Sequence, residues 1–174
     1  MISYKVEPKS RAEIRAYAHE FRKYLKLDKH LYFPIVELLD IMSDIFYGFS
    51  YEIVDDNELP LNVHADTDIT KGHIRIKESV YDGACNGEGR DRMTIAHEIG
   101  HYFLIYYCGF RLERNFDGKE LRSFEDPEWQ AKCFAGELLI PAHLVGDLTP
   151  EEISEKCGVS FDAAVVQHKS MRKG

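Results

Sequence analysis

Apolar residues recur at helical spacing in two segments near the start of the chain. The first segment spans residues 10–26, where basic side chains fill positions between the apolar ones. Its apolar positions are Ile14, Ala18, Phe21 and Leu25. This spacing predicts an amphipathic helix with one buried face. A second helix is expected from Pro34, a residue suited to a first helical position, to a stop at Gly48.

The period of the apolar pattern changes to two in the next part of the chain. Apolar and polar residues alternate over residues 49–54 and again over residues 73–77, which predicts two strands of a small sheet. Residues 55–60 are turn-like, and residues 62–72 can hold either a further short strand or a loop. The glycine-rich run at residues 82–89 predicts a flexible loop.

Helical spacing returns at residues 91–107, a segment that contains the sequence HEIGH. Asp91 is suited to the N-cap of this helix, and Gly109 is suited to its C-terminal stop. After a polar stretch, a further helix is expected over residues 127–140, with Asp126 as its N-cap and proline at its first position. These two helices follow one another with only a loop between them.

The remaining residues predict a short helical tail. One helix is expected at residues 150–157 and another at 161–171, joined by the turn Gly158-Val159-Ser160. No internal repeat, low-complexity tract or domain boundary interrupts the pattern. A single domain over residues 1–174 is therefore expected, and its parts are the N-terminal helices and small sheet (1–89), the HEIGH helix and its successor (90–141) and the helical tail (142–174).

Composition narrows the class of protein. A chain of 174 residues that is 44% hydrophobic can form a proper core. The formal net charge of -8 argues against a nonspecific grip on nucleic acid, which requires an excess of Lys and Arg. The four cysteines contain no CxxC pair, so reduced thiols are expected. Charges interrupt every apolar run, which predicts a cytoplasmic protein without a membrane-spanning segment.

The HEIGH sequence carries the candidate chemistry. His97 and His101 lie four residues apart, so on a helix their imidazoles point to the same side and can bind one Zn²⁺ at about 2.0–2.1 Å each. Glu98 follows the first histidine and can serve as the general base of a zinc peptidase. The alternative is that these three residues recur by chance, and the helical context favours zinc over it.

A third protein ligand would complete such a zinc site, and an acidic residue on a later helix can provide it. Glu128 falls in the first turn of the helix expected after Asp126, where an acidic side chain also stabilises the helix dipole. Glu137 lies about two and a half turns further along the same helix. Local reasoning favours Glu128 and leaves Glu137 as its competitor.

Two longer blocks resemble a known family. The run RDRMTIAHEIGHYFL, followed by EWQAKCFAGELLIP, is similar to the two signature blocks of the ImmA/IrrE family of metallo-endopeptidases and covers residues 90–141. The resemblance implies zinc ligation by His97, His101 and Glu128, with Glu98 catalytic. It also implies a compact gluzincin-like α+β fold, in which a small antiparallel or mixed sheet packs against the HEIGH helix and several other helices. Its substrates are expected to be helix-turn-helix repressors or antitoxins.

The chain departs from the family pattern at two positions. Lys132 stands where the family usually carries Asn or Asp, a residue expected to support the site. Ile105 stands where a histidine often follows the motif. The first departure bears on the activity level, and the second is the weaker of the two.

The predicted function is that of a zinc-dependent endopeptidase that cleaves a regulatory protein, without direct contact to nucleic acid or membrane. A zinc-bearing interaction or sensor module of the same fold, with little or no proteolytic activity, remains the alternative. The tail also resembles a helix-turn-helix in outline, but its basic residues are offset by acidic ones, so it lacks a basic recognition face.

Two parts of the mechanism stay open at the level of sequence. A second oxyanion donor is expected, yet Tyr106, Tyr107 and His143 are merely near the motif or in a downstream turn. One hypothesis for substrate binding is that the strand at residues 73–77 presents an open edge to an extended peptide.

Overall fold

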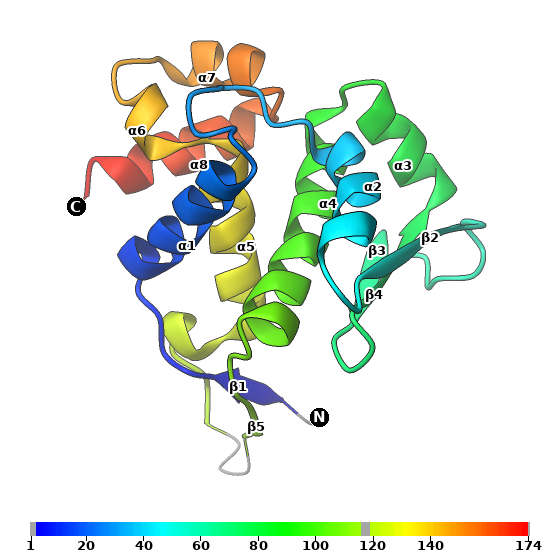
Figure 1. Ribbon diagram of the computed structural model, residues 1–174. Coiled ribbons are helices and arrows are strands. Elements are labelled where there is room, and N and C mark those ends of the chain that lie inside the picture. The colour runs from blue at the N-terminus through cyan, green and yellow to red at the C-terminus, as the bar shows by residue number, and fades with distance from the viewer. Residues whose placement is uncertain (1–2, 116–118, 174) are drawn as a thin grey trace.

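The helix that contains HEIGH, α4, runs through the middle of the molecule, and the other elements pack on both sides of it (Figure 1). The computed structural model describes residues 3–115 and 119–173. In chain order its elements are β1 (Tyr4–Val6), α1 (Arg11–Tyr24), α2 (Ile35–Ile45), β2 (Ser50–Val54), β3 (Ala65–Asp68), β4 (His73–Lys77), α3 (Glu78–Cys85), α4 (Gly89–His101), the π-helix η1 (Tyr102–Tyr107), β5 (Leu112–Arg114), the 3₁₀ helix η2 (Ser123–Glu125), α5 (Pro127–Leu139), α6 (Ala142–Val145), α7 (Pro150–Cys157) and α8 (Phe161–Met171).

The predicted helix starts are confirmed where a capping side chain marks them. Ser10 and Glu13 form a capping box at the start of α1, in which the side chain of each residue accepts a hydrogen bond from the backbone N–H of the other. Asp126 caps α5 by accepting a hydrogen bond of 3.0 Å from the backbone N–H of Glu128. The tail helices α7 and α8 also occupy their predicted positions, and Gly158 between them has the left-handed conformation that ends a helix.

The small sheet is mixed. Its strand order is β2-β4-β3, with β2 parallel and β3 antiparallel to the central strand β4. Ile74 and Ile76 of β4 have no exposed surface because both neighbours and the helices cover them. The hypothesis of an open edge at residues 73–77 is therefore wrong, since β4 is paired on both sides. Among the described residues, the unpaired edge that faces α4 is that of β3, within residues 62–72, where the sequence allows either a strand or a loop.

The flexible loop expected at residues 82–89 is shorter than predicted, because residues 82–85 belong to helix α3, which ends at Cys85, and residue 89 begins α4. Gly83, within α3, has a packing role, because a Cβ at this position would collide with the carboxylate of Asp91. Asp91 lies inside the first turn of α4, so the prediction that it is the N-cap is wrong. The helix begins at Gly89 with Glu88 as its N-cap, and Gly89 packs directly on the backbone of Val159.

The end of the HEIGH helix also differs from a regular α-helix. Residues 102–107 form a π-helix, in which the N–H of Cys108 donates to the carbonyl of Phe103 at 2.8 Å, five residues earlier. Two aromatic pairs four residues apart stack along this segment, Tyr102 on Tyr106 and Phe103 on Tyr107. The wider turn accommodates these stacked rings, and Gly109, with a φ of +69°, follows it as predicted.

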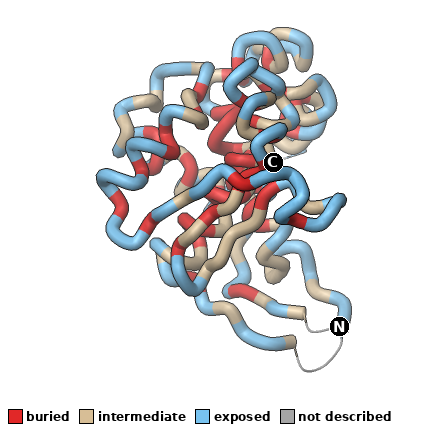
Figure 2. Tube along the Cα trace, turned by 90° about the vertical axis from the view of Figure 1, so that its right-hand side faces the viewer, coloured by how far each residue is buried: buried red, intermediate tan, exposed pale blue. Residues whose placement is uncertain are grey.

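Strands β1 and β5 were not predicted because each has only three residues. They pair antiparallel in a two-stranded ribbon at one end of the molecule, although they are far apart in sequence (Figure 1). The core itself is continuous, and in Figure 2 the buried segments lie inside while exposed segments form the outline. Among the described residues, no helix has the length and apolar character needed to cross a membrane.

Two arginines are buried within this core and bind backbone carbonyl groups. Arg22 is fully buried and donates to the carbonyl oxygen of Leu138 at 2.8 Å, which ties α1 to the end of α5. Arg92 is 1% exposed and donates to the carbonyl oxygens of Phe33 and Gly158, both at 2.8 Å. Arg92 thereby holds α4 to the loop before α2 and to the turn after α7.

Replacing Arg92 by alanine should destabilise the fold strongly. The substitution leaves a cavity and two buried carbonyl groups without donors, each costing about 1–3 kcal/mol, so a loss of roughly 3–5 kcal/mol is expected. Urea unfolding followed by circular dichroism measures it. The control is Lys23→Ala, which removes only an exposed ion pair with Glu20 and should leave the unfolding midpoint nearly unchanged. Equal midpoints for both variants would contradict the assigned role of Arg92.

Candidate metal centre

Helices α4 and α5 approach closely at the glycine of HEIGH. A Cβ added to Gly100 would lie 3.0 Å from the carbonyl oxygen and 3.2 Å from the Cα of Ala131. The absence of a side chain therefore lets the two helix backbones come together. Because Glu128 lies in the first turn of α5, this approach brings its carboxylate over the face of α4 that carries His97 and His101.

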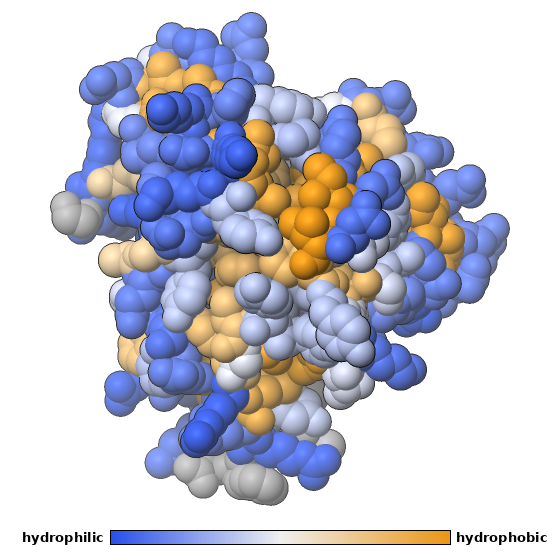
Figure 3. All heavy atoms as spheres, in the orientation of Figure 1, coloured by the Kyte–Doolittle hydropathy of each residue, from blue (hydrophilic) through white to orange (hydrophobic). Residues whose placement is uncertain are grey.

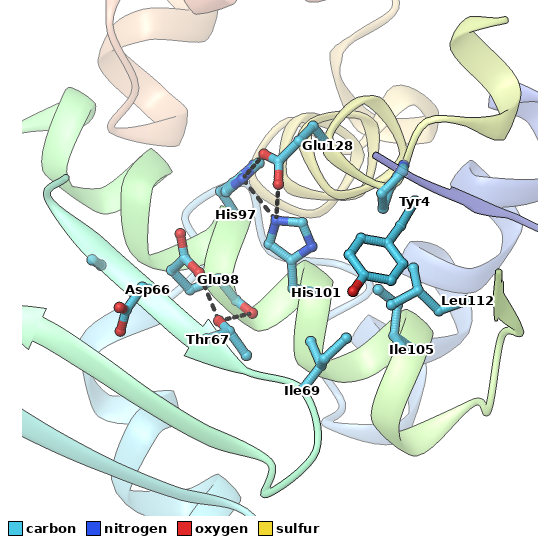
Figure 4. Close-up of a pocket in the computed structure, with 12 residues that line it drawn as sticks. Tyr4, Asp66, Thr67, Ile69, His97, Glu98, His101, Ile105, Leu112 and Glu128 are labelled. Carbon is cyan, nitrogen blue, oxygen red and sulfur yellow. Dashed lines mark hydrogen bonds and ion pairs between the residues drawn. The ribbon is translucent and has the colours of Figure 1, made fainter. Parts of the chain in front are cut away.

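The three candidate ligands converge as the sequence predicted. His97 Nε2 lies 3.1 Å from Glu128 Oε2, and His101 Nε2 lies 3.1 Å from Glu128 Oε1. The two histidine Nε2 atoms are themselves 3.1 Å apart. Figure 4 shows both rings and the carboxylate pointing toward one another from α4 and α5. Among the described residues, this trio is the group of His, Cys, Asp and Glu side chains that can hold a metal ion.

The donor set fits a small divalent cation. Ligands about 2.0–2.1 Å from a tetrahedral zinc lie roughly 3.3 Å apart, close to the separations of 3.1 Å between donor atoms. Two imidazole nitrogens and a carboxylate are also the donor types of hydrolytic zinc sites. A cation that displaced the Nε2 protons would be shared by both imidazole nitrogens and the carboxylate, all of which face one another.

Protonation of the trio follows from these contacts. Hydrogen bonds from His101 and His97 hold the pKa of Glu128 well below its usual range. Burial lowers the pKa of His101, but the hydrogen bond and negative charge of Glu128 outweigh it, so the net pKa is raised. The carboxylate of Glu128 is thus ionised over the whole physiological range and is ready to bind a cation.

Glu98 lies beside the trio without joining it. Its side chain is buried, at 7% exposure, and Thr67 of β3 donates a hydrogen bond of 2.6 Å to its Oε2. Burial raises the pKa of Glu98, and the hydrogen bond from Thr67 opposes part of that increase. A carboxylate of raised pKa next to a candidate metal-binding trio is suited to accepting and returning a proton. Thr67 was missed from sequence because its segment could not be assigned as strand or loop.

Glu137, the competing ligand, faces the opposite direction on α5. Its side chain has no exposed surface and forms ion pairs with Arg15 Nε at 2.9 Å and Arg11 Nη1 at 3.3 Å. These arginines belong to α1, so Glu137 joins α1 to α5. The structure brings Glu128, and not Glu137, to the two histidines.

A cavity of about 380 Å³ opens in front of the trio. Its walls come from the edge of β3, from α4 and η1, from the start of α5 and from the β1–β5 ribbon. The lining side chains include Tyr4, Asp66, Thr67, Ile69, Ile105 and Leu112. Ile105, the position where a histidine often follows the motif, is therefore part of an apolar wall. Lys132 is exposed and lies in another groove, beside Trp129 and Asp162.

The residues considered as oxyanion donors from sequence lie elsewhere. Tyr106 stacks on Tyr102 and packs against the backbone at Gly48 and Gly72. Tyr107 lines an aromatic groove of about 280 Å³ between α1 and η1. Figure 3 shows that apolar side chains also gather at the middle of the face seen in Figure 1. His143 lies 2.6 Å from the carbonyl oxygen of Asp28, on the side of α1.

A paired-histidine helix, an acidic residue on the next long helix and an adjoining small sheet define a metallopeptidase-like domain. Residues 59–167 match the IrrE N-terminal-like domain family, Peptidase_M78, and the chain belongs to this family. The match confirms the resemblance noted from the two sequence blocks. No curated protein matches the chain by sequence.

A solved structure shares the fold. The Mycobacterium tuberculosis transcriptional regulator is 19% identical to this chain, with a TM-score of 0.58 over 88% of this chain and 45% of the regulator. This chain thus spans less than half of the length of that protein. At this level of identity the likeness concerns the fold, and it supports the predicted α+β class.

Replacing Gly100 by valine should separate α4 from α5. Side-chain atoms placed against Ala131 should cost about 1–3 kcal/mol of stability and move Glu128 away from the histidines, which weakens metal binding. Urea unfolding and calorimetric titration with zinc measure the two effects. The matched control is Gly146→Val, because a Cβ at Gly146 meets nothing within 4 Å. Unchanged zinc affinity in the Gly100 variant would show that the helix contact does not position Glu128.

Proposed function

We propose that this domain is a zinc-dependent endopeptidase that cleaves a regulatory protein, such as a helix-turn-helix repressor or an antitoxin. The observation that carries the proposal is the convergence of His97, His101 and Glu128 beside a buried Glu98 on the floor of an open cavity. Membership of the IrrE N-terminal-like domain family supports a peptidase of this kind. The repressor substrate follows from the resemblance of the two sequence blocks to the ImmA/IrrE family.

Three protein ligands leave a coordination position for water or substrate. A zinc ion held by the trio would polarise a peptide carbonyl and lower the pKa of a water molecule to about 7. Glu98 would accept a proton from the attacking water molecule as the water oxygen bonds to the carbonyl carbon. When the C–N bond breaks, Glu98 passes the proton to the leaving amine, so the products are a carboxyl group and an amine.

The free edge of β3 supports binding of an extended substrate. β3 is hydrogen-bonded to β4 on one side, and its other side borders the cavity through Ala65, Asp66 and Thr67. A peptide in extended conformation can pair with such an edge and place its backbone across the metal ligands. Thr67 lies on this strand and also donates a hydrogen bond to Glu98. The same strand would therefore align the substrate and hold the general base.

A zinc-bearing interaction module is the second candidate. The similar solved protein is described as a transcriptional regulator, and Lys132 replaces the Asn or Asp that the family usually carries. A module of this kind would bind a regulatory protein and leave it intact. Incubation with a purified helix-turn-helix repressor separates the candidates, because the enzyme yields two fragments and the module yields a stable complex.

Metal content should depend on Glu128 and not on Glu137. Wild-type protein is expected to bind about one zinc per chain, and Glu128→Ala should lower the affinity on the order of 100-fold or more, because it removes a ligand. Glu137→Gln should retain the zinc and lose stability, since its carboxylate pairs with Arg11 and Arg15. Atomic absorption and competition with a chelator measure both. Loss of zinc from the Glu137 variant, with Glu128→Ala unaffected, would overturn the ligand assignment.

Replacing Glu98 by glutamine should abolish cleavage while zinc remains bound. Glutamine has a similar shape but cannot accept the proton, so a decrease in kcat of roughly 10²–10⁴-fold is expected. Mass spectrometry of a repressor or quenched-fluorescent peptide substrate follows the products, and metal analysis provides the control. Undiminished cleavage by Glu98→Gln would refute the general-base role.

A further inference from the structure

The β1–β5 ribbon brings the N-terminal segment to the metal centre. In an antiparallel pair, directly opposed residues share a face, and Tyr4 pairs with Arg114 while Val6 pairs with Leu112. Lys5 and Glu113 occupy the other face, where they form an ion pair of 3.4 Å. Tyr4 and Leu112 are consequently directed toward the body of the protein, and both line the cavity in front of the histidines.

Tyr4 reaches the side of the centre that Glu98 leaves free. Figure 4 shows the Tyr4 ring beside His101, with its hydroxyl group directed toward the space between His101 and Ile69. Glu98 lies on the other side of the same histidine pair, next to Thr67. A substrate carbonyl at the trio would therefore have a proton acceptor on one side and a hydroxyl donor on the other.

The hydroxyl of Tyr4 is available for this contact. Among the described residues it has no hydrogen-bond partner, and the side chain is 40% exposed toward the cavity and solvent. The other neutral hydroxyl in the wall, that of Thr67, already donates to Glu98. Of the aromatic hydroxyl groups in the described part of the chain, that of Tyr4 is the one in the cavity wall.

The strand that carries Tyr4 is attached to the helix that carries Glu128. Gln130 of α5 is 1% exposed, and its Nε2 donates to the carbonyl oxygen of Glu7, directly after β1, at 2.8 Å. Val6 is buried, and the N–H of Asn115 donates to the carbonyl oxygen of Ser3 at 3.0 Å. These contacts fix the backbone of β1 relative to α5, so the point from which the Tyr4 side chain extends is set before substrate binds.

We propose that Tyr4 is a catalytic residue whose hydroxyl donates a hydrogen bond to the oxyanion that forms when water adds to the scissile carbonyl. This assignment rests on the proposed peptidase function. The negative charge develops on the former carbonyl oxygen, and a fixed donor that meets it there stabilises the transition state more than the planar substrate. The Tyr4 proton stays on its oxygen, and Glu98 carries the proton that moves.

The test compares wild-type protein with Tyr4→Phe, which removes one oxygen and keeps the ring. Zinc-loaded proteins are assayed with quenched-fluorescent peptides, and the best-cleaved peptide is also prepared in phosphinic form, which mimics the tetrahedral intermediate. Tyr4→Phe should lower kcat on the order of 10²–10³-fold with KM and zinc content unchanged. It should also weaken phosphinic-peptide binding, measured by calorimetry, by a similar factor.

The matched control is Tyr107→Phe, which removes a hydroxyl from the aromatic groove on another face and should alter neither measurement. Wild-type cleavage together with an equally active Tyr4→Phe variant would overturn the role of Tyr4 and leave the peptidase function standing. A zinc-loaded wild type that cleaves no peptide or repressor would overturn the peptidase function, and the role of Tyr4 with it.

Discussion

The contact between Gly100 and Ala131 determines how the three candidate metal ligands meet. Two helices can approach this closely only where one of them lacks a side chain, and here that position lies within HEIGH, directly before the second histidine. The approach places the first turn of α5 over α4, so an acidic residue that would otherwise serve only the helix dipole meets two imidazoles. The third candidate ligand can therefore come from the next long helix in the chain.

Buried charged side chains fix the orientation of α5 relative to α1. Glu137 is enclosed by Arg11 and Arg15, and Arg22 binds the carbonyl group of Leu138 at the end of the same helix. Removing one partner from such a buried group costs far more than an exposed ion pair contributes. The polar contacts between α1 and α5 therefore specify orientation, while the apolar core supplies most of the driving force.

Sequence patterns predicted the long helices, two of the strands and the convergence of His97, His101 and Glu128, because each has a local signal. Caps at Ser10 and Asp126 mark helix starts, and the four-residue spacing of the histidines defines a common face. Local sequence signals gave wrong predictions where tertiary packing decides the backbone conformation. Gly83 is an example, since glycine in a polar run indicates a loop, but here it admits the side chain of Asp91 within a helix.

Sequence could not reveal Thr67 or Tyr4 for a related reason. Each lies in a strand of three or four residues, too short for a period of two to be recognised, and each acquires its position only when a distant segment pairs with it. Thr67 depends on β4 and Tyr4 depends on β5, which follows it by more than a hundred residues in the chain. The candidate metal ligands come from two long helices, whereas Thr67 and Tyr4, which lie around Glu98 and the cavity, come from strand pairing. Local sequence therefore identifies the candidate metal ligands first, and the residues proposed to set rate and specificity become visible only in three dimensions.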